Sequence, residues 1–215
     1  MIVRSKQLVL LVGSNPLPNL VAASLLSQPD GCIHVVHTIE TLPFAKNLEK
    51  LLLNKLESRH EQFGFLCLNS PTNQFIIHQV ISSYFVNNMP LPIETVGLNY
   101  TSGMKSMAVH VYEFIKDWCR EKQSTFSFSY LDPQTNVLKF TKGNEKRLTN
   151  EECRLSLVEL LALHGRRVFE EETSAAFPSF RNNLANIAAN PSCSSVRREL
   201  TKKFEETFRG TASEA

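Results

Sequence analysis

The sequence predicts an α/β fold with a doubly wound, mostly parallel sheet, followed by a small helical or winged-helix-like unit at the carboxyl-terminal end. Three observations lead to this class. Short β-like runs alternate with longer helical patterns as far as residue 122. The links between them are short, as right-handed crossovers between parallel strands require. The first β-like run, residues 7–13, is almost entirely aliphatic, which is typical of a strand buried on both faces.

The predicted strands are runs rich in aliphatic, β-branched or aromatic residues that end at turn-forming residues. The first strand ends at Gly13-Ser14-Asn15-Pro16. The fifth alternates with period two and is joined through Asp132-Pro133 to a sixth, as in a hairpin at a sheet edge. The predicted strands are residues 7–13, 32–37, 63–68, 93–99, 126–130 and 136–140.

Helices are predicted where apolar residues recur at helical spacing. The first, residues 19–26, is expected to stop at a turn formed by residues 28–31, and Thr41 is expected to cap the second. The third is predicted over residues 72–87. The clearest pattern covers residues 103–122, whose apolar face contains Met104, Met107, Ala108, Val111, Phe114, Ile115 and Trp118.

From about Gly143 onward the pattern is only helical, which divides the chain into residues 1–145 and a smaller unit of residues 146–215. Thr149-Asn-Glu-Glu152 resembles a capping box ahead of a leucine-rich helix, and Gly165 stands where a C-cap glycine belongs. Residues 180–189 are also predicted to be helical. A stripe at i, i+4 spacing is a candidate packing face for a partner subunit or a further domain: Val196, Leu200, Phe204 and Phe208.

Composition restricts the classes of partner. The 215 residues include 23 Lys and Arg against 21 Asp and Glu, so the net charge of +2 creates no general attraction for nucleic acid. Any anion site must therefore be local, and DNA or RNA binding by the carboxyl-terminal unit is disfavoured. No apolar run reaches the roughly 18 residues that cross a bilayer, and the first residues lack the core of a signal peptide. We expect a cytoplasmic protein without a membrane partner.

The sequence carries no signature of a cofactor, a metal site or a known catalytic centre. The five cysteines form no CxxC pair, and none of the six histidines forms HxxxH with an acidic partner on one helix face. The motifs GxGxxG, GxxxxGK[ST] and GxSxG are all missing. We therefore predict no cofactor and no metal, and assign no catalytic residue.

Two loops form the candidate ligand-binding site, because ligands of open parallel sheets bind beyond the carboxyl ends of the strands, where strand order reverses. The first loop is stiffened by two prolines and contains Gly13, Ser14, Asn15, Pro16, Leu17, Pro18 and Asn19. The second precedes the clearest helix, where free N–H groups, hydroxyls and a lysine gather, and contains Asn99, Tyr100, Thr101, Ser102, Gly103, Met104 and Lys105. Taken alone, the first loop can also be a rigid connecting turn, and the second an N-cap with a solvated lysine.

Residues 11–20, Leu-Val-Gly-Ser-Asn-Pro-Leu-Pro-Asn-Leu, and residues 98–108, Leu-Asn-Tyr-Thr-Ser-Gly-Met-Lys-Ser-Met-Ala, resemble the paired motifs of CARF domains, the CRISPR-associated Rossmann folds. The similarity is closest to the branch whose second motif reads N-Y-T-G-G-T-K-x-M-A. It covers about residues 5–165, including residues 157–165, which in such proteins open a linker or winged-helix-like unit. The resemblance implies a Rossmann-like sensing domain in type III CRISPR antiviral defence.

The resemblance further implies a homodimer that binds a cyclic oligoadenylate, with cyclic tetraadenylate as the favoured ring, and relays the signal to an output region. Each subunit would contribute both loops, with Lys105 and the helix N-termini facing the phosphates. A ligand with two-fold symmetry suits an isologous dimer, because each subunit then supplies half of the site.

Ser102 and Met104 depart from the motif, where glycine and threonine are common. These residues narrow the space and remove one hydroxyl, so the sequence favours binding of the ring over its cleavage. Two alternatives stay open. One is a ring nuclease in which Thr101, Ser102 and Lys105 hold a ribose 2′-hydroxyl in line with the adjacent phosphodiester. The other is a ligand-responsive regulator whose carboxyl-terminal unit binds DNA.

Overall fold

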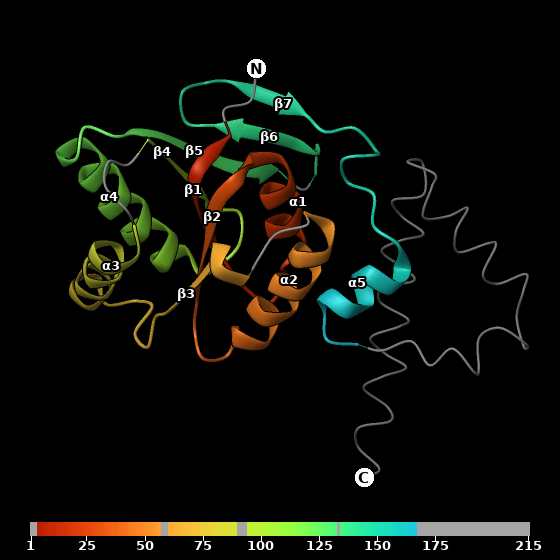
Figure 1. The fold of residues 1–215 in the computed structure, drawn as a ribbon, viewed down its shortest axis with the longest axis horizontal. Helices are drawn as coiled ribbons and strands as arrows, with labels where there is room; N and C mark the ends of the chain where they lie inside the picture. The colour runs from red at the N-terminus through yellow and green to blue at the C-terminus, as the bar shows by residue number, and fades with distance from the viewer. Residues whose placement is uncertain (1–3, 57–59, 90–93, 133, 167–215) are drawn as a thin grey trace, which may run out of the picture. The chain divides into compact units, whose positions relative to one another are not determined.

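A computed structural model describes residues 4–56, 60–89, 94–132 and 134–166 of this chain (Figure 1). Strands and helices alternate in the order that the sequence predicts. The strands are β1 (Ser5–Leu11), β2 (Ser27–His37), β3 (Phe63–Cys67), β4 (Thr95–Asn99), β5 (Thr125–Asp132), β6 (Val137–Phe140) and β7 (Glu145–Arg147). The helices are α1 (Leu17–Leu26), α2 (Leu42–Lys55), the 3-10 helix η1 (His60–Gln62), α3 (Gln74–Asn88), α4 (Lys105–Glu121) and α5 (Leu157–Leu163).

The strands form one seven-stranded sheet in the order β3-β2-β1-β4-β5-β6-β7. Neighbours from β3 to β5 are parallel, whereas β6 and β7 are antiparallel. The chain winds outward from β1 to β3, crosses back through α3, and enters β4 on the other side of β1. Strand order therefore reverses between β1 and β4, which confirms the predicted α/β class with its doubly wound, mostly parallel sheet.

Helices cover both faces of the sheet, with α1, α2 and α5 on one side and α3 and α4 on the other (Figure 1). Successive residues of β1 point to opposite faces of the sheet and therefore pack in different cores. Leu8 and Leu10 pack in the core that contains α1 and α2, while Val9 and Leu11 pack in the core that contains α3 and α4. Because both faces are buried there, β1 is aliphatic from Leu8 to Leu11. Among the described residues, no helix combines the length and apolar character needed to cross a membrane.

Local predictions are wrong at three points before residue 149. Residues 28–31 do not form a separate turn after the helix, because β2 already begins at Ser27. They form an irregularity in the pairing of β2 with β1, between the pairs Ser5–Ser27 and Gln7–Cys32. Thr41 precedes α2, but its Oγ1 accepts from the N–H of Thr38 at 2.9 Å and does not cap the helix. The stretch after Gly143 is not purely helical, because β7 pairs with β6.

The chain forms two capping boxes close together, and only the second begins a helix. The Thr149 N–H donates to Glu152 Oε2 at 2.9 Å and the Glu152 N–H to Thr149 Oγ1 at 3.3 Å, yet a single turn follows. The Ser156 and Glu159 box begins α5 instead. At the end of α5, Gly165 has φ +72°, and the Arg166 N–H donates to Leu161 O at 2.8 Å in a Schellman arrangement.

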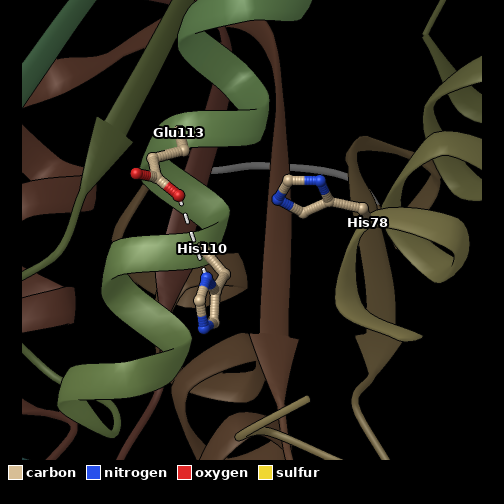
Figure 2. Close-up of side chains that lie close together, drawn as sticks. All are labelled: His78, His110 and Glu113. Atoms are coloured by element: carbon tan, nitrogen blue, oxygen red, sulfur yellow. Dashed lines mark ion pairs between the residues drawn. The ribbon is translucent and has the colours of Figure 1, made fainter. Parts of the chain in front are cut away.

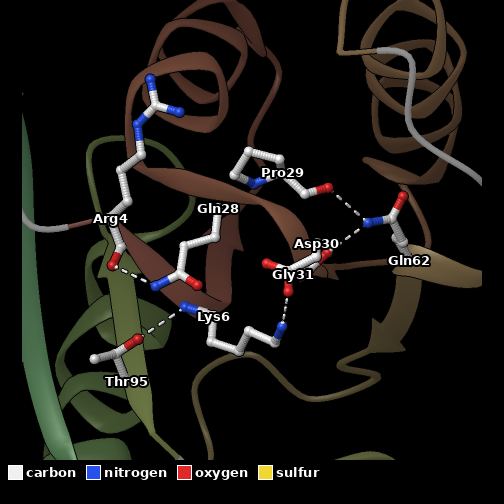
Figure 3. A network of polar contacts seen from close by, with 8 residues as sticks. All are labelled: Arg4, Lys6, Gln28, Pro29, Asp30, Gly31, Gln62 and Thr95. Atoms are coloured by element: carbon white, nitrogen blue, oxygen red, sulfur yellow. Dashed lines mark hydrogen bonds and ion pairs between the residues drawn. The ribbon is translucent and has the colours of Figure 1, made fainter.

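A polar network joins the amino-terminal ends of three strands (Figure 3). The Lys6 N–H donates to Thr95 Oγ1 at 2.9 Å, and the Lys6 ammonium pairs with Asp30. Gln62 Nε2 donates to Pro29 O and Gly31 O, both at 3.1 Å. A hollow of about 90 Å³ lies beside this network. It is at the opposite end of the strands from the two predicted loops, and Gln28 Nε2, which lines it, donates to Arg4 O at 3.2 Å.

The division at residue 145 stays a prediction. Residues 167–215 lie outside the described residues, and so do the helix predicted over residues 180–189 and the apolar stripe that begins at Val196.

Candidate ligand-binding site

The two predicted loops meet at the point where strand order reverses. They follow β1 and β4, which are parallel neighbours in the sheet. A β-carbon added to Gly13 would lie 2.9 Å from the backbone nitrogen of Gly103, which is closer than real β-carbons approach. Gly103 has φ +87°, a backbone conformation that glycine adopts without strain. The loops therefore touch backbone to backbone, and both contact positions require glycine.

A hydrogen bond joins the loops in addition to this contact. Ser102 Oγ donates to the backbone oxygen of Asn15 at 3.0 Å. The side chain of Asn15 turns back to its own loop, where Oδ1 accepts from the Leu17 N–H at 3.2 Å. Serine at position 102, the first departure from the family motif, thus supplies a link between the loops that glycine lacks.

Hydrogen bonds made by the polar side chains of Asn99 and Thr101 attach the second loop to β5. Asn99 is fully buried; its Nδ2 donates to Ser129 Oγ at 3.0 Å and its Oδ1 accepts from the Thr101 N–H at 3.3 Å. Thr101 Oγ1 in turn accepts from the N–H of Leu131 at 2.8 Å. The loop is therefore fixed to β5 through side chains, which preorganises it for a ligand.

The start of α4 is a positively charged point on the surface. Met104 is the N-cap residue and makes no side-chain hydrogen bond to the helix, and the first turn contains no acidic residue. The exposed Lys105 is the first helical residue, and its ammonium group has no hydrogen bond or ion pair with the described part of the chain. Because the helix N-terminus is itself positive, lysine is electrostatically unfavourable there until an anion binds.

Tyr100 adds an aromatic surface to the second loop. Its ring stacks on Tyr130 at a centroid distance of 6.1 Å and meets Tyr112 edge-on at 5.9 Å. Burial raises the pKa of Tyr100 above its ordinary value, so the hydroxyl stays protonated near neutrality. Tyr130 was not among the predicted site residues, because it lies in a strand and only the strand pairing places it here.

The structure brings the two loops together but gives their residues different exposures. Asn19 is fully buried and its Nδ2 donates to Leu11 O at 2.8 Å, which holds the end of β1. The other buried members are Pro16 and Asn99. The partly buried members are Gly13, Leu17, Pro18, Tyr100, Thr101 and Ser102, and the exposed members are Ser14, Asn15, Gly103, Met104 and Lys105.

Exposed apolar side chains also occur at this end of the sheet, and of these only Met104 was among the predicted site residues. Ile39 in the loop after β2 is 64% exposed, and Phe75 in the first turn of α3 is 76% exposed. Met104, the N-cap residue of α4, and Val109 on α4 are about half exposed. Because β1 to β4 are parallel, the loops after these strands lie at the same end of the sheet. The Ser106 hydroxyl donates to Pro71 O at 3.1 Å and joins two of these segments.

No protein-family model matches this chain, and no curated protein matches it. Solved structures do resemble it. Protein VC1899 from Vibrio cholerae is 13% identical with a TM-score of 0.59, and the match covers 73% of this chain and 38% of that chain. Can2 from Sulfobacillus thermosulfidooxidans, solved in complex with cyclic tetra-adenylate, is 16% identical with a TM-score of 0.56, and the match covers 75% of this chain and 40% of that chain. The described chain therefore shares its Rossmann-like fold with about two fifths of each of these proteins.

Proposed function

We propose that this chain is a CARF-like sensor of type III CRISPR defence that binds cyclic tetraadenylate across a homodimer and relays the signal to an output region. One observation carries the proposal: two backbone-packed loops at the strand-order reversal present Lys105, which has no partner among the described residues, at a helix start without a side-chain cap. The likeness of the fold to a protein solved with cyclic tetra-adenylate supports the same ligand class. So does the paired-motif resemblance of residues 11–20 and 98–108.

The chemistry of the loops suits a ring of adenylates. Each adenylate brings one phosphodiester, which the Lys105 ammonium and the N–H groups of the first turn of α4 can bind together. An adenine can stack on an aromatic surface such as the one that Tyr100 and Tyr130 form. Two subunits related by a two-fold axis would present two such half-sites to one ring.

The apolar rim explains how a second subunit would be held. Ile39, Phe75 and Met104 expose large apolar side chains at the end of the sheet where the loops lie. Val109 lies one turn beyond Lys105 on the same face of α4. An isologous contact over this rim would bury these side chains and close the ligand between two copies of each loop.

Binding is favoured over cleavage because the two hydroxyls that could position a ribose 2′-hydroxyl already make hydrogen bonds within the chain. Ser102 Oγ donates a hydrogen bond to Asn15 O, and Thr101 Oγ1 accepts a hydrogen bond from the Leu131 N–H. Within the described parts of the two loops, the titratable side chains are Tyr100 and Lys105, so no carboxylate or imidazole there can act as a general base. Cleavage would therefore depend only on how the loops position the ribose 2′-hydroxyl and the adjacent phosphodiester.

Calorimetric titration with cyclic tetraadenylate and cyclic hexaadenylate tests the proposal. We expect one tetraadenylate ring per two chains, and a mass near twice 24.3 kDa in light scattering. Lys105→Ala should weaken binding about tenfold or more, because a hydrogen bond to a charged group is worth about 1.5–3 kcal/mol. Lys50→Ala is the matched control, since Lys50 is exposed on α2 on the opposite face of the sheet. No heat with either ring, or equal losses at the two lysines, contradicts the proposal.

Incubation with a labelled ring separates the sensor from the ring nuclease. We expect the ring to stay intact while it is bound. Rapid release of linear adenylates, abolished by Lys105→Ala, would assign the enzyme instead.

A further inference from the structure

Three side chains that can bind a metal come together between α3 and α4 (Figure 2). His78 extends from α3 toward α4, while His110 and Glu113 lie one turn apart on α4. One ligand atom from each residue lies within 4.8 Å of the other two. The sequence could not reveal this cluster, because its members come from two helices and the HxxxH criterion examines only one.

One nitrogen of each imidazole in this cluster is buried without a hydrogen-bond partner among the described residues. They are His78 Nε2 and His110 Nδ1. The Glu113 Oε2 atom lies 3.8 Å from His110 Nδ1, which is too far for a hydrogen bond. A buried polar atom without a partner costs about 1–3 kcal/mol, so the cluster is not satisfied by its own contacts. Phe114 packs against the His78 ring at a centroid distance of 5.6 Å.

We propose that His78, His110 and Glu113 bind a Zn²⁺ ion that joins α3 to α4, with water as the fourth ligand. Two imidazoles and one carboxylate are a common zinc ligand set, and tetrahedral zinc holds its ligands at about 2.0–2.2 Å. Ligand atoms around such an ion lie about 3.3 Å apart. The 3.8 Å pair is close to this value, and the Glu113 side chain, 46% exposed, is free to rotate inward. The ion would give both unpartnered nitrogens a bond.

The location gives the ion a structural role. Near the start of α4, Ser106 Oγ already donates to Pro71 O in the segment that leads to α3. The zinc ion would be a second link, one turn further along α4 than that hydrogen bond. The site is separate from the ligand loops, so this proposal does not depend on the proposed function.

Cobalt titration of the full chain, freed of any histidine tag and of metal, tests the site. Co²⁺ in a four-coordinate nitrogen and oxygen site has visible d–d bands, and Zn²⁺ should displace it at one ion per chain. Removal of a residue that only supports a ligand typically weakens metal binding 10–100-fold. His78→Gln and His110→Gln remove ligands themselves, so we expect each to weaken Zn²⁺ binding by at least about 100-fold.

His164→Gln is the matched control, because His164 ends α5 on the other face of the sheet. Glu113→Gln tests the site even if a histidine variant fails to fold, since this side chain is half exposed; Zn²⁺ should raise the melting temperature of the wild type but not of this variant. Three results overturn the proposal: no saturable cobalt spectrum, a sulfur-to-metal charge-transfer band that assigns the metal to cysteines, or an affinity that His78→Gln and His110→Gln leave unchanged.

Discussion

Gly13 and Gly103 approach each other so closely that a β-carbon on the first would lie 2.9 Å from the backbone nitrogen of the second. This contact joins the ends of β1 and β4 at the reversal of strand order. It also means that a single methyl group is enough to separate the two loops, since the atom it would meet belongs to the backbone and not to a flexible side chain.

Gly13→Ala should therefore separate the loops. We expect a stability loss of about 1–3 kcal/mol from the steric conflict and at least tenfold weaker binding of cyclic tetraadenylate, measured by denaturation and calorimetry. Gly143→Ala is the control: Gly143 has φ +86° but open space around its position. The Gly143→Ala variant should lose about 1–2 kcal/mol of stability from backbone strain, while its binding of cyclic tetraadenylate should be unchanged. Equal binding losses in the two variants would show that the loop contact is not specific.

Thr101→Val should destabilise the protein by about 1–3 kcal/mol, because it removes the acceptor for the Leu131 N–H. Valine has nearly the same shape, so the loss reports the hydrogen bond. Thr101→Ser retains the hydroxyl and should lose far less. Urea denaturation of the three proteins measures the difference. If the valine variant is as stable as the wild type while the serine variant loses stability, the methyl group matters and the hydroxyl does not.

Because of His34, the free energy of unfolding should depend on pH. Its Nε2 lies 2.7 Å from Gln7 Oε1 and its Nδ1 lies 3.0 Å from the Tyr84 hydroxyl, an arrangement that suits a neutral ring. Burial lowers the pKa of His34 from 6.5 to about 4. Between these pH values the unfolded chain binds a proton that the folded chain does not. Stability should therefore fall as the pH drops from about 6.5 to 4, by on the order of 3 kcal/mol.

Denaturation curves at several pH values measure this slope. Carboxylates add their own acid dependence, so the comparison is with His34→Phe, which lacks the titrating group. The variant should be less stable at pH 7, because Gln7 and Tyr84 lose their partner, but its pH slope should be smaller. A slope equal to that of the wild type would show that another group carries the acid dependence.

Ser156→Ala should cost about 1 kcal/mol, because it removes the side-chain cap of α5. Ser156→Asp should restore most of this loss, since aspartate accepts the same hydrogen bond from the Glu159 N–H. Glu159 also pairs with Lys55 of α2 at 2.8 Å. Loosening of α5 should therefore appear as faster hydrogen exchange at the end of α2, and no change there would mean that the helices are not coupled.

Much of this fold follows from patterns that are local in sequence. The aliphatic run of β1 indicates a strand covered on both faces, and alternation with helices indicates its parallel neighbours. The meeting of the two loops was also predictable, because the reversal of strand order is a property of the topology. What the sequence could not show is which side chains meet across elements. Thr101 with Leu131 and Tyr100 with Tyr130 depend on strand pairing, and His78 with His110 depends on how two helices pack.

The misplaced helix start has a physical reason. The Thr149 and Glu152 pair forms the hydrogen bonds of a capping box, so the local pattern was correct. The helix does not follow because Cys153 and Leu155 pack against the core with α1 and α2, and the chain continues as a helix only after Ser156. Tertiary packing therefore determines which of the two capping boxes begins the helix.

The outermost strand limits how the sheet can grow. β7 consists of Glu145, Lys146 and Arg147, all charged, and pairs only with the short strand β6 within the described chain. A short, charged edge is a poor template for adding a strand from another molecule. Charge at this border therefore disfavours edge-to-edge pairing of β7 with a strand from another copy.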